Sequence, residues 1–174
     1  MRKLFLSSVC LSILLVPPAA DAQVQDHDGQ FGLRTGIGTG LQYFVSYGED
    51  KTDLSRAPFA VSAAASYGLT SALEVALGGI LALEKPGHLS SRPVAATAGV
   101  RYFYNPLSFL KFYSTLDGVL PVTPRADFGL RNEDGIQYDF NEYIGLFCGL
   151  DLTVLFVADL TTIAGLNAGF QLRI

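Results

Sequence analysis

The stretch Leu166-Asn-Ala-Gly-Phe-Gln-Leu-Arg-Ile174 alternates apolar and polar positions along its whole length. Every second side chain from Leu166 is apolar, whereas Asn167, Gly169, Gln171 and Arg173 fall on the opposite face. A period of two residues is that of a β-strand, whose successive side chains point to opposite faces. The stretch therefore predicts a strand between an apolar and a polar environment, as in a β-barrel that spans lipid.

The same alternation recurs along most of the chain. Glycines occupy one face of the segment 31–48, where they would make a helix unstable. The expected strands are residues 31–48, 59–67, 73–83, 94–104, 110–118, about 136–150, 154–161 and 166–174. The expected connections are long and polar at 49–57, 85–92 and 121–135, and tight at 68–71, 105–108, 151–153 and near Thr162. These segments predict an all-β fold, an eight-stranded antiparallel up-and-down transmembrane β-barrel over residues 30–174.

Composition favours a membrane protein without membrane helices. The mean hydropathy is +0.33, yet beyond residue 22 no apolar run approaches the roughly 18 residues that a membrane helix needs. The alternative is a soluble eight-stranded ligand carrier, whose bulky face would point inward. Its outer face would then be rich in Gly and Ala and poor in the charges that a soluble surface carries. The net charge of −4 argues against nucleic-acid binding.

Aromatic residues support two interfacial girdles, which are typical of barrels in lipid. Those expected at the outer rim are Tyr43, Tyr47, Phe59, Tyr138 and Phe140. Those expected at the inner rim are Tyr67, Tyr102, Tyr104 and Phe112. Because the long connections alternate with tight ones, both chain ends are expected on the periplasmic side.

The front of the chain predicts export. A basic Met1-Arg-Lys3, an apolar run over 4–16 and Ala20-Asp-Ala22 have the order of a cleavable signal peptide, predicted over residues 1–22. Residues 23–29 are expected to form a flexible lead-in. After cleavage Cys148 is the one cysteine, so we expect no intrachain disulfide and interpret Cys148 as a small apolar wall residue.

The cleavable signal, the glycine-rich first strand, the eight alternating segments and the terminal Gly169-x-x-Leu172-x-Ile174 pattern together resemble the small outer-membrane β-barrel family, of the OmpA-domain and OmpX type. The usual last residue of that terminal pattern is aromatic, and Ile174 departs from it. The resemblance implies a location in the bacterial outer membrane. It also implies contact with outer-membrane lipid and lipopolysaccharide, and engagement of the barrel-assembly machinery through the C-terminal strand.

The polar faces of the expected strands place a set of charged side chains in the lumen. This candidate lumen network comprises Arg34, Glu74, Arg101, Lys111, Asp117, Asp139 and Arg173. An eight-stranded barrel is barely wide enough for its own side chains, and charges removed from water need partners. The favoured interpretation is an ion-paired plug, and the alternative is a narrow polar pathway or gate. Glu74 and Arg101, from adjacent strands, form the pair to test first.

Two short motifs carry weaker hypotheses. His88-Leu-Ser90 brings together a His and a Ser, as in outer-membrane lipid A deacylases, but Ser91 stands where that family has Asn and the first downstream carboxylate is distant Asp117. We interpret it as a solvated loop. Asp26-His-Asp28 has metal-ligand chemistry, but adjacent residues rarely converge on one ion, so we expect a solvated tail. No catalytic, cofactor-binding or metal site is predicted.

The predicted function is that of a non-enzymatic outer-membrane barrel protein with a structural or interaction role through its external loops. Two alternatives remain open. One is a narrow channel for small or apolar solutes, and the other is a lipid A-modifying enzyme.

Overall fold

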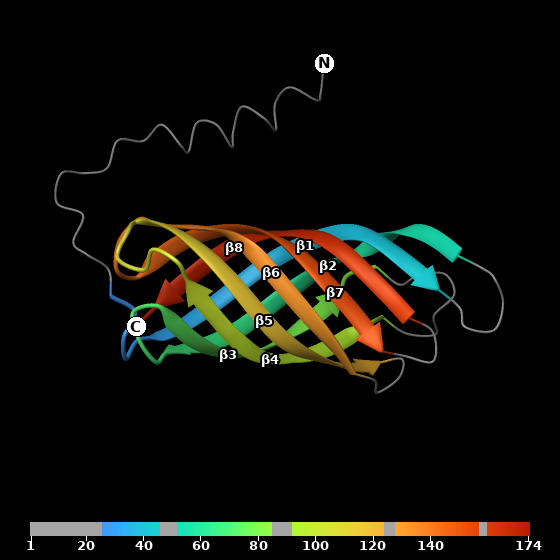
Figure 1. Cartoon of the computed structure of the whole chain (residues 1–174), viewed down its shortest axis with the longest axis horizontal. Helices are drawn as coiled ribbons and strands as arrows, with labels where there is room; N and C mark the ends of the chain where they lie inside the picture. Colours follow the sequence, from blue (N-terminus) through green and yellow to red (C-terminus); the bar gives the residue numbers. More distant parts are fainter. Residues whose placement is uncertain (1–25, 46–51, 85–91, 124–127, 157–159) are drawn as a thin grey trace, which may run out of the picture.

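The computed structural model describes residues 26–45, 52–84, 92–123, 128–156 and 160–174. Its strands are β1 (Phe31–Val45), β2 (Thr52–Gly68), β3 (Leu73–Ala82), β4 (Val94–Phe103), β5 (Leu110–Thr123), β6 (Phe128–Asp139), β7 (Ile144–Phe156) and β8 (Leu160–Arg173). Each strand pairs antiparallel with the next one, and β8 pairs with β1, so the sheet closes (Figure 1). The prediction of an eight-stranded antiparallel up-and-down barrel is confirmed. Within the described ranges, no helix is long and apolar enough to cross a membrane.

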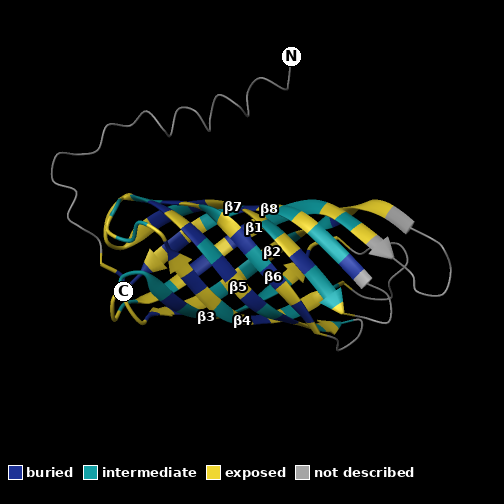
Figure 2. Ribbon diagram, in the orientation of Figure 1, coloured by how far each residue is buried: buried dark blue, intermediate teal, exposed yellow. Residues whose placement is uncertain are grey.

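Side chains alternate between the inside and the outside of the barrel. In β5, for example, Lys111 and Tyr113 are buried, whereas Phe112 and Leu116 are exposed. Figure 2 shows the resulting chequered pattern of buried and exposed positions on the wall. The bulky apolar face therefore points outward, opposite to the arrangement of a soluble carrier. Such an apolar exterior suits lipid.

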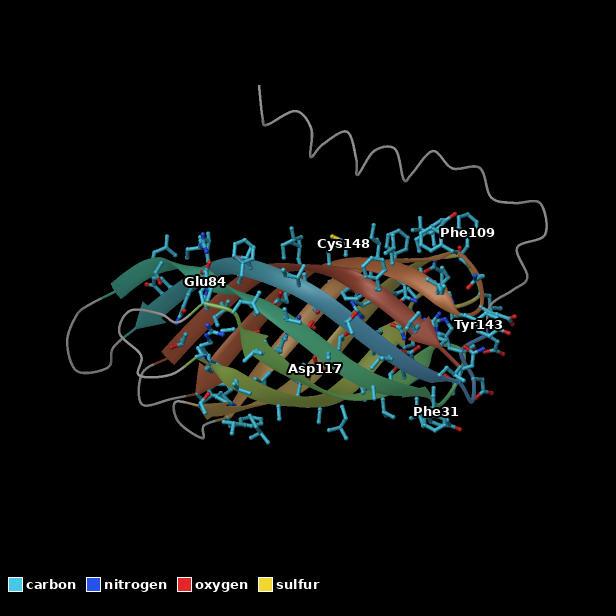
Figure 3. All side chains as sticks on the ribbon, turned by 180° about the vertical axis from the view of Figure 1, so that it is seen from behind. Phe31, Glu84, Phe109, Asp117, Tyr143 and Cys148 are labelled. Carbon is cyan, nitrogen blue, oxygen red and sulfur yellow. The ribbon has the colours of Figure 1, made fainter. Side chains whose placement is uncertain are left out.

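Both described chain ends and three tight turns lie at one end of the barrel, which we call the terminal rim. The turns connect β2 to β3, β4 to β5 and β6 to β7. Figure 3 shows Phe31, Phe109 and Tyr143 at this rim and Glu84 near the opposite end, which we call the distal rim. Asn141 stabilises the last turn, because its Oδ1 accepts hydrogen bonds from the backbone N–H of Tyr143 (2.9 Å) and Ile144 (2.8 Å).

The seam between the first and last strands closes with regular backbone hydrogen bonds. Phe31 N donates to Ile174 O at 3.0 Å, and Ile174 N donates to Phe31 O at 2.8 Å. Deeper in the seam, Gly36 and Gly169 face each other as Cα partners. The C-terminal stretch thus occupies the closing strand of the barrel, and closure removes the unpaired strand edges that would otherwise be exposed.

Several expected boundaries are wrong in the second half of the chain. Most of the expected loop 121–135 belongs to strands, because β5 continues to Thr123 and β6 begins at Phe128. The expected strand 136–150 is divided at 140–143 by a turn, and residues 151–153 belong to β7. The cause is that charged side chains in these segments face one another inside the barrel and resemble loop residues in the sequence. The expected loop 49–57 is also too long, because β2 begins at Thr52.

Two aromatic assignments are wrong because the expected strand 136–150 is divided by the turn at 140–143. Tyr138 and Phe140 lie at the terminal rim, where the Tyr138 ring contacts those of Phe140 (5.2 Å between centroids) and Phe109 (5.7 Å). At the distal end, Phe128 and Phe156 stack on the outer wall with centroids 6.2 Å apart. The expected signal peptide over 1–22, Tyr47, the His88-Ser90 motif and most of the connection 85–92 lie outside the described residues.

Candidate functional site

The lumen is the candidate site, because it gathers most of the buried charge of the described chain. Its cationic side chains are Arg34, Arg101, Lys111, Arg131 and Arg173. Its carboxylates are Glu74, Asp117, Glu133, Asp139 and Asp151, of which Asp151 is the least buried. Each of these side chains comes from an inward position of a strand, and the two sets balance in number.

A terminal cluster of six residues blocks the lumen near the terminal rim. We define it as His27, Glu74, Arg101, Lys111, Asp139 and Arg173. Arg101 Nη1 donates to Glu74 Oε2 at 2.9 Å. Asp139 Oδ2 lies 2.8 Å from Lys111 Nζ and 3.1 Å from Arg173 Nη1. Each carboxylate is thus shared between two cations, which offsets the cost of burying it.

His27 fills the centre of the terminal cluster. Its side chain is 1% exposed, with Nδ1 3.2 Å from Glu74 Oε1 and Nε2 3.6 Å from Asp139 Oδ2. Lys111 Nζ also contacts Nε2, and the ring meets Phe103 edge-on at 4.7 Å. Backbone bonds hold this position, since Gly29 N donates to Gly68 O at 3.0 Å. The interpretation of His27 as part of a solvated tail is therefore wrong.

A central layer of aromatic rings and one guanidinium lies next to the terminal cluster, on its distal side. Arg34 Cζ stands 3.4 Å from the centroid of the Phe147 ring and 4.5 Å from that of Tyr113. Arg34 Nη2 donates to Glu133 Oε1 at 2.7 Å, and the Tyr113 hydroxyl donates to the same oxygen at 2.6 Å. The rings of Phe103 and Tyr113 pack edge to face, with their centroids 6.2 Å apart. These bulky groups fill the cross-section of the barrel.

A distal cluster surrounds Arg131. Its guanidinium contacts Glu133, lies 3.5 Å from Asp151 Oδ2 and is 3.9 Å from Asp117 Oδ2. Asn167 Nδ2 donates to Glu133 Oε2 at 3.2 Å. Glu133 therefore joins this cluster to Arg34 of the central layer, so ion pairs and hydrogen bonds run from the middle of the lumen toward its distal end.

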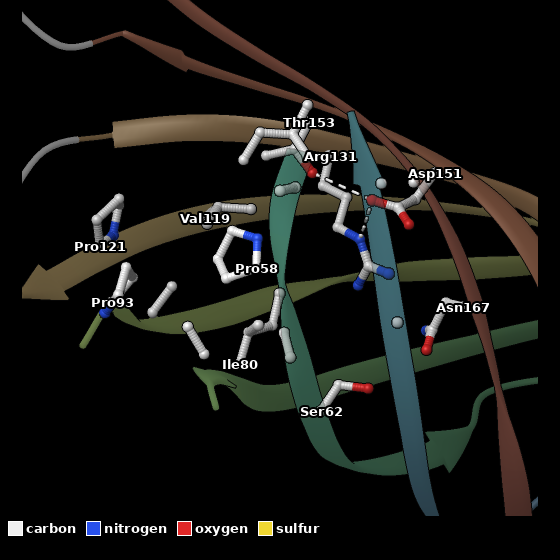
Figure 4. A pocket seen from close by; sticks show the side chains of 18 of the residues that line it. Pro58, Ser62, Ile80, Pro93, Val119, Pro121, Arg131, Asp151, Thr153 and Asn167 are labelled. Atoms are coloured by element: carbon white, nitrogen blue, oxygen red, sulfur yellow. Dashed lines mark hydrogen bonds and ion pairs between the residues drawn. The ribbon is translucent and has the colours of Figure 1, made fainter. Parts of the chain in front are cut away.

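Between the distal cluster and the distal rim, the lumen becomes apolar and open. A cavity of about 180 Å³, which we call the vestibule, has walls that include Pro58, Ile80 and Val119. Arg131 and Asp151 form part of its floor (Figure 4). A second cavity of about 40 Å³ lies deeper, between Arg34 and Arg131. The larger of these two cavities, at the distal end, has room for a small molecule.

All seven residues of the predicted lumen network lie inside the barrel. Glu74 and Arg101 are Cα partners across β3 and β4 and form the ion pair described above. Lys111, Asp139 and Arg173 join them, whereas Arg34 and Asp117 belong to the central layer and the distal cluster. Sequence reasoning missed Arg131, Glu133 and Asp151, because these residues fell in segments expected to be a loop and a turn. The spacing of two residues between Arg131 and Glu133 was the feature of the sequence that could have indicated one face of a strand.

His27 was missed because no strand pattern precedes residue 31. Among the described residues, no group of three or more His, Cys, Asp and Glu side chains is arranged to hold a metal ion. Cys148 points outward from β7 in Figure 3 and is exposed.

Comparison with known proteins identifies the fold. No family model and no curated protein matches the sequence. Among solved structures, Neisserial surface protein A aligns with a TM-score of 0.58 at 14% identity, covering 84% of this chain and 100% of that one. OprG from Pseudomonas aeruginosa aligns with 0.54 at 13% identity, covering 87% and 99%. The N-terminal β-barrel domain of Pseudomonas aeruginosa OprF aligns with 0.50 at 16% identity, covering 83% and 98%.

The chain is therefore a transmembrane β-barrel by its closed sheet and apolar exterior. More narrowly, it has the fold of the small eight-stranded outer-membrane barrels, as the resemblance in its sequence implied.

Proposed function

We propose that this protein is a non-enzymatic structural barrel of the bacterial outer membrane with a closed lumen, and that it acts through the connections at its distal rim. The observation that carries the proposal is the network of ion pairs and aromatic rings that fills the lumen from His27 to Arg131. A charge-balanced interior of this kind favours a rigid wall over a water-filled pore.

The orientation of the barrel follows from the same proposal. The terminal rim has tight turns and faces the periplasm, as in small outer-membrane barrels. The distal connections 46–51, 85–91, 124–127 and 157–159 then face the outside and carry the contacts with partners. Residues 1–22 serve as the export signal, β8 engages the assembly machinery, and lipopolysaccharide surrounds the distal rim. There the exposed Arg56 pairs with Glu84 at 2.6 Å.

Planar-bilayer recording tests lumen closure. The mature protein is refolded, its heat-modifiable migration on gels verifies the folded barrel, and single-channel current is then recorded. We expect no steady conductance from the wild-type protein. A triple variant, His27→Ala with Tyr113→Ala and Phe147→Ala, removes the ring at the centre of the terminal cluster and two rings of the central layer. It provides the matched control, and current is expected only there. A stable channel in the wild-type protein would overturn the proposal of a closed barrel.

Replacement of the distal connections tests whether they carry the proposed contacts with partners. Each of 46–51, 85–91, 124–127 and 157–159 is exchanged for a short Gly/Ser turn, and binding of whole cells to immobilised host or bacterial surfaces is measured. The proposal expects a folded barrel with reduced binding from at least one exchange. Unchanged binding in all four variants would contradict it.

A second candidate function is the uptake or binding of small apolar solutes, and the vestibule supports it. Its volume of about 180 Å³ exceeds that of an apolar cavity of about 150 Å³ that holds benzene. Ala82→Phe would fill the vestibule, because Ala82 lines it and is buried. Ala98→Phe adds the same ring on the exposed outer face. Solute entry into proteoliposomes should fall with Ala82→Phe alone, and equal rates would exclude this function.

A further inference from the structure

One polar pair lies on the outer wall of β6, whose other outward side chains are aromatic or aliphatic. The outward residues of β6 are Phe128, Leu130, Asn132, Asp134, Ile136 and Tyr138. Asn132 Nδ2 donates to Asp134 Oδ2 at 2.8 Å, and this pair is exposed on the barrel surface. The inward residues of the same strand, such as Arg131 and Glu133, are buried in the lumen. The pair therefore belongs to the surface that meets lipid and not to the lumen network.

The pair lies near the middle of the apolar belt. Asp134 is near the middle of β6, between Phe128 at the distal end and Tyr138 at the terminal rim. Its Cα partners are Ser114 on β5 and Leu150 on β7. Asn132 has Leu116 and Leu152 as its partners, and both leucines are exposed. A carboxylate and an amide thus form a polar patch, together with Ser114, inside a ring of leucine side chains.

A carboxylate at this depth needs a partner. Ionisable groups that face the membrane interior are costly, and they usually pair with other polar groups. Every carboxylate of the lumen lies within 4 Å of a cationic side chain. In the described parts of the chain, by contrast, no ion pair joins Asp134 to a cation, and Asn132 is its hydrogen-bond donor. A group that compensates the Asp134 carboxylate would therefore have to come from outside this barrel.

We propose that this face of β6 is the interface between two copies of the chain, related by a two-fold axis along the membrane normal. The inference rests on the proposed membrane location. Both copies insert in the same direction, so Asp134 of each copy lies at the same depth as Asp134 of the partner subunit. A two-fold interface presents the same patch from both sides, and it must therefore be self-complementary.

The chemistry of the patch meets that requirement. The amide of Asn132 carries two N–H groups; one binds Asp134 of its own copy, and the other donates to Asp134 of the partner subunit. Ser114 is small and lets the walls approach, while Leu116, Leu150 and Leu152 pack around the polar centre. Small residues at the contact and polar residues as hydrogen-bonding centres are what membrane interfaces use.

Cysteine cross-linking in proteoliposomes tests the interface. In a Cys148→Ser background, Ser114→Cys places a thiol on the patch, and Ala65→Cys places one on the exposed face of β2, which is four strands from β6 on the opposite wall. A short bismaleimide is added at low protein-to-lipid ratio. We expect dimers from Ser114→Cys at least five times as often as from Ala65→Cys. Adding Asp134→Leu to Ser114→Cys should reduce the dimer yield to the Ala65→Cys level.

Asn132→Leu provides a second variant, which keeps the carboxylate and removes the bridging donor, and it should also reduce the yield. Equal yields from the two cysteine positions, or an Asp134→Leu protein that cross-links as its parent does, would overturn the interface. Heat-modifiable migration is measured on every sample. A folded barrel that forms no dimer refutes the interface alone, whereas a chain that shows no heat-dependent shift in lipid refutes the proposed membrane barrel as well.

Discussion

Glu74 and Arg101 face each other as Cα partners across β3 and β4 and form an ion pair of 2.9 Å with both side chains almost fully buried. Arg173 and His27 approach the same carboxylate at 3.7 and 3.2 Å. Glu74 is therefore the residue through which β3, β4, β8 and the segment before β1 are joined inside the barrel. Removal of this one carboxylate would leave several cationic or polar groups buried without their partner.

Glu74→Ala is expected to destabilise the barrel by about 3 to 5 kcal/mol, because it leaves buried charges uncompensated. The free energy of unfolding is measured by urea titration of the protein in lipid vesicles. Glu84→Ala is the matched control, since Glu84 pairs with Arg56 at the surface with 49% of its side chain exposed. Exposed ion pairs contribute about 0 to 1 kcal/mol. Similar losses in the two variants would show that the lumen pair is not a structural centre.

His27→Ala is expected to open the terminal end of the lumen. Its ring separates Glu74 from Asp139, and without it the two carboxylates and Lys111 face an unfilled space. The free energy of unfolding in lipid vesicles, measured by urea titration, should then fall by about 1 to 3 kcal/mol, because buried polar groups lose a partner. Asp28→Ala, at an exposed neighbouring position, is the control and should leave the free energy of unfolding unchanged. Equal stabilities of the two variants would show that His27 does not hold the terminal cluster together.

Leu77→Arg is expected to cost about 2 to 4 kcal/mol of folding free energy in bilayers, the range for a cation on the lipid face at mid-depth. Leu77 lies in the middle of β3 and is 68% exposed. Ala76→Ser, at the next position and therefore on the other face, should have a mild effect. Folding yields and unfolding curves of the two variants give the comparison, and equal effects would contradict the assigned faces.

Gly169→Ala is expected to disrupt the seam between β1 and β8. An added Cβ would overlap the Thr35 carbonyl oxygen and lie 2.6 Å from Gly36 Cα, and backbone atoms cannot move aside without opening the closing ladder. Gly79→Ala is the matched control, because its Cβ would meet a single atom, Ala95 O, at 3.3 Å. Heat-modifiable migration should be weakened or lost only for Gly169→Ala. A fully folded Gly169→Ala barrel would show that the seam has room to relax.

Much of the fold was predictable because alternation carries two kinds of information at once. In β3 and β4 the period of two marks a strand and also assigns each side chain to the lumen or to lipid. Glu74 and Arg101 were placed inward on that basis, and so was Lys111 in β5. The prediction was weaker where inward positions hold charges in succession. Arg131 and Glu133 resemble a polar loop, because a sequence does not show whether a charged residue meets water or an opposite charge.

By itself, the sequence determined the strand number, the inward and outward faces of most strands and the role of the C-terminal stretch as a membrane-facing strand. Each of these depends on the spacing of side chains along one segment, which is a local property. Only the tertiary structure decided the register of the strands and the partners of each buried charge. His27 meets Glu74 and Asp139, and Arg34 meets Glu133, because closing the sheet brings distant segments across a lumen too narrow to hold an unpaired charge.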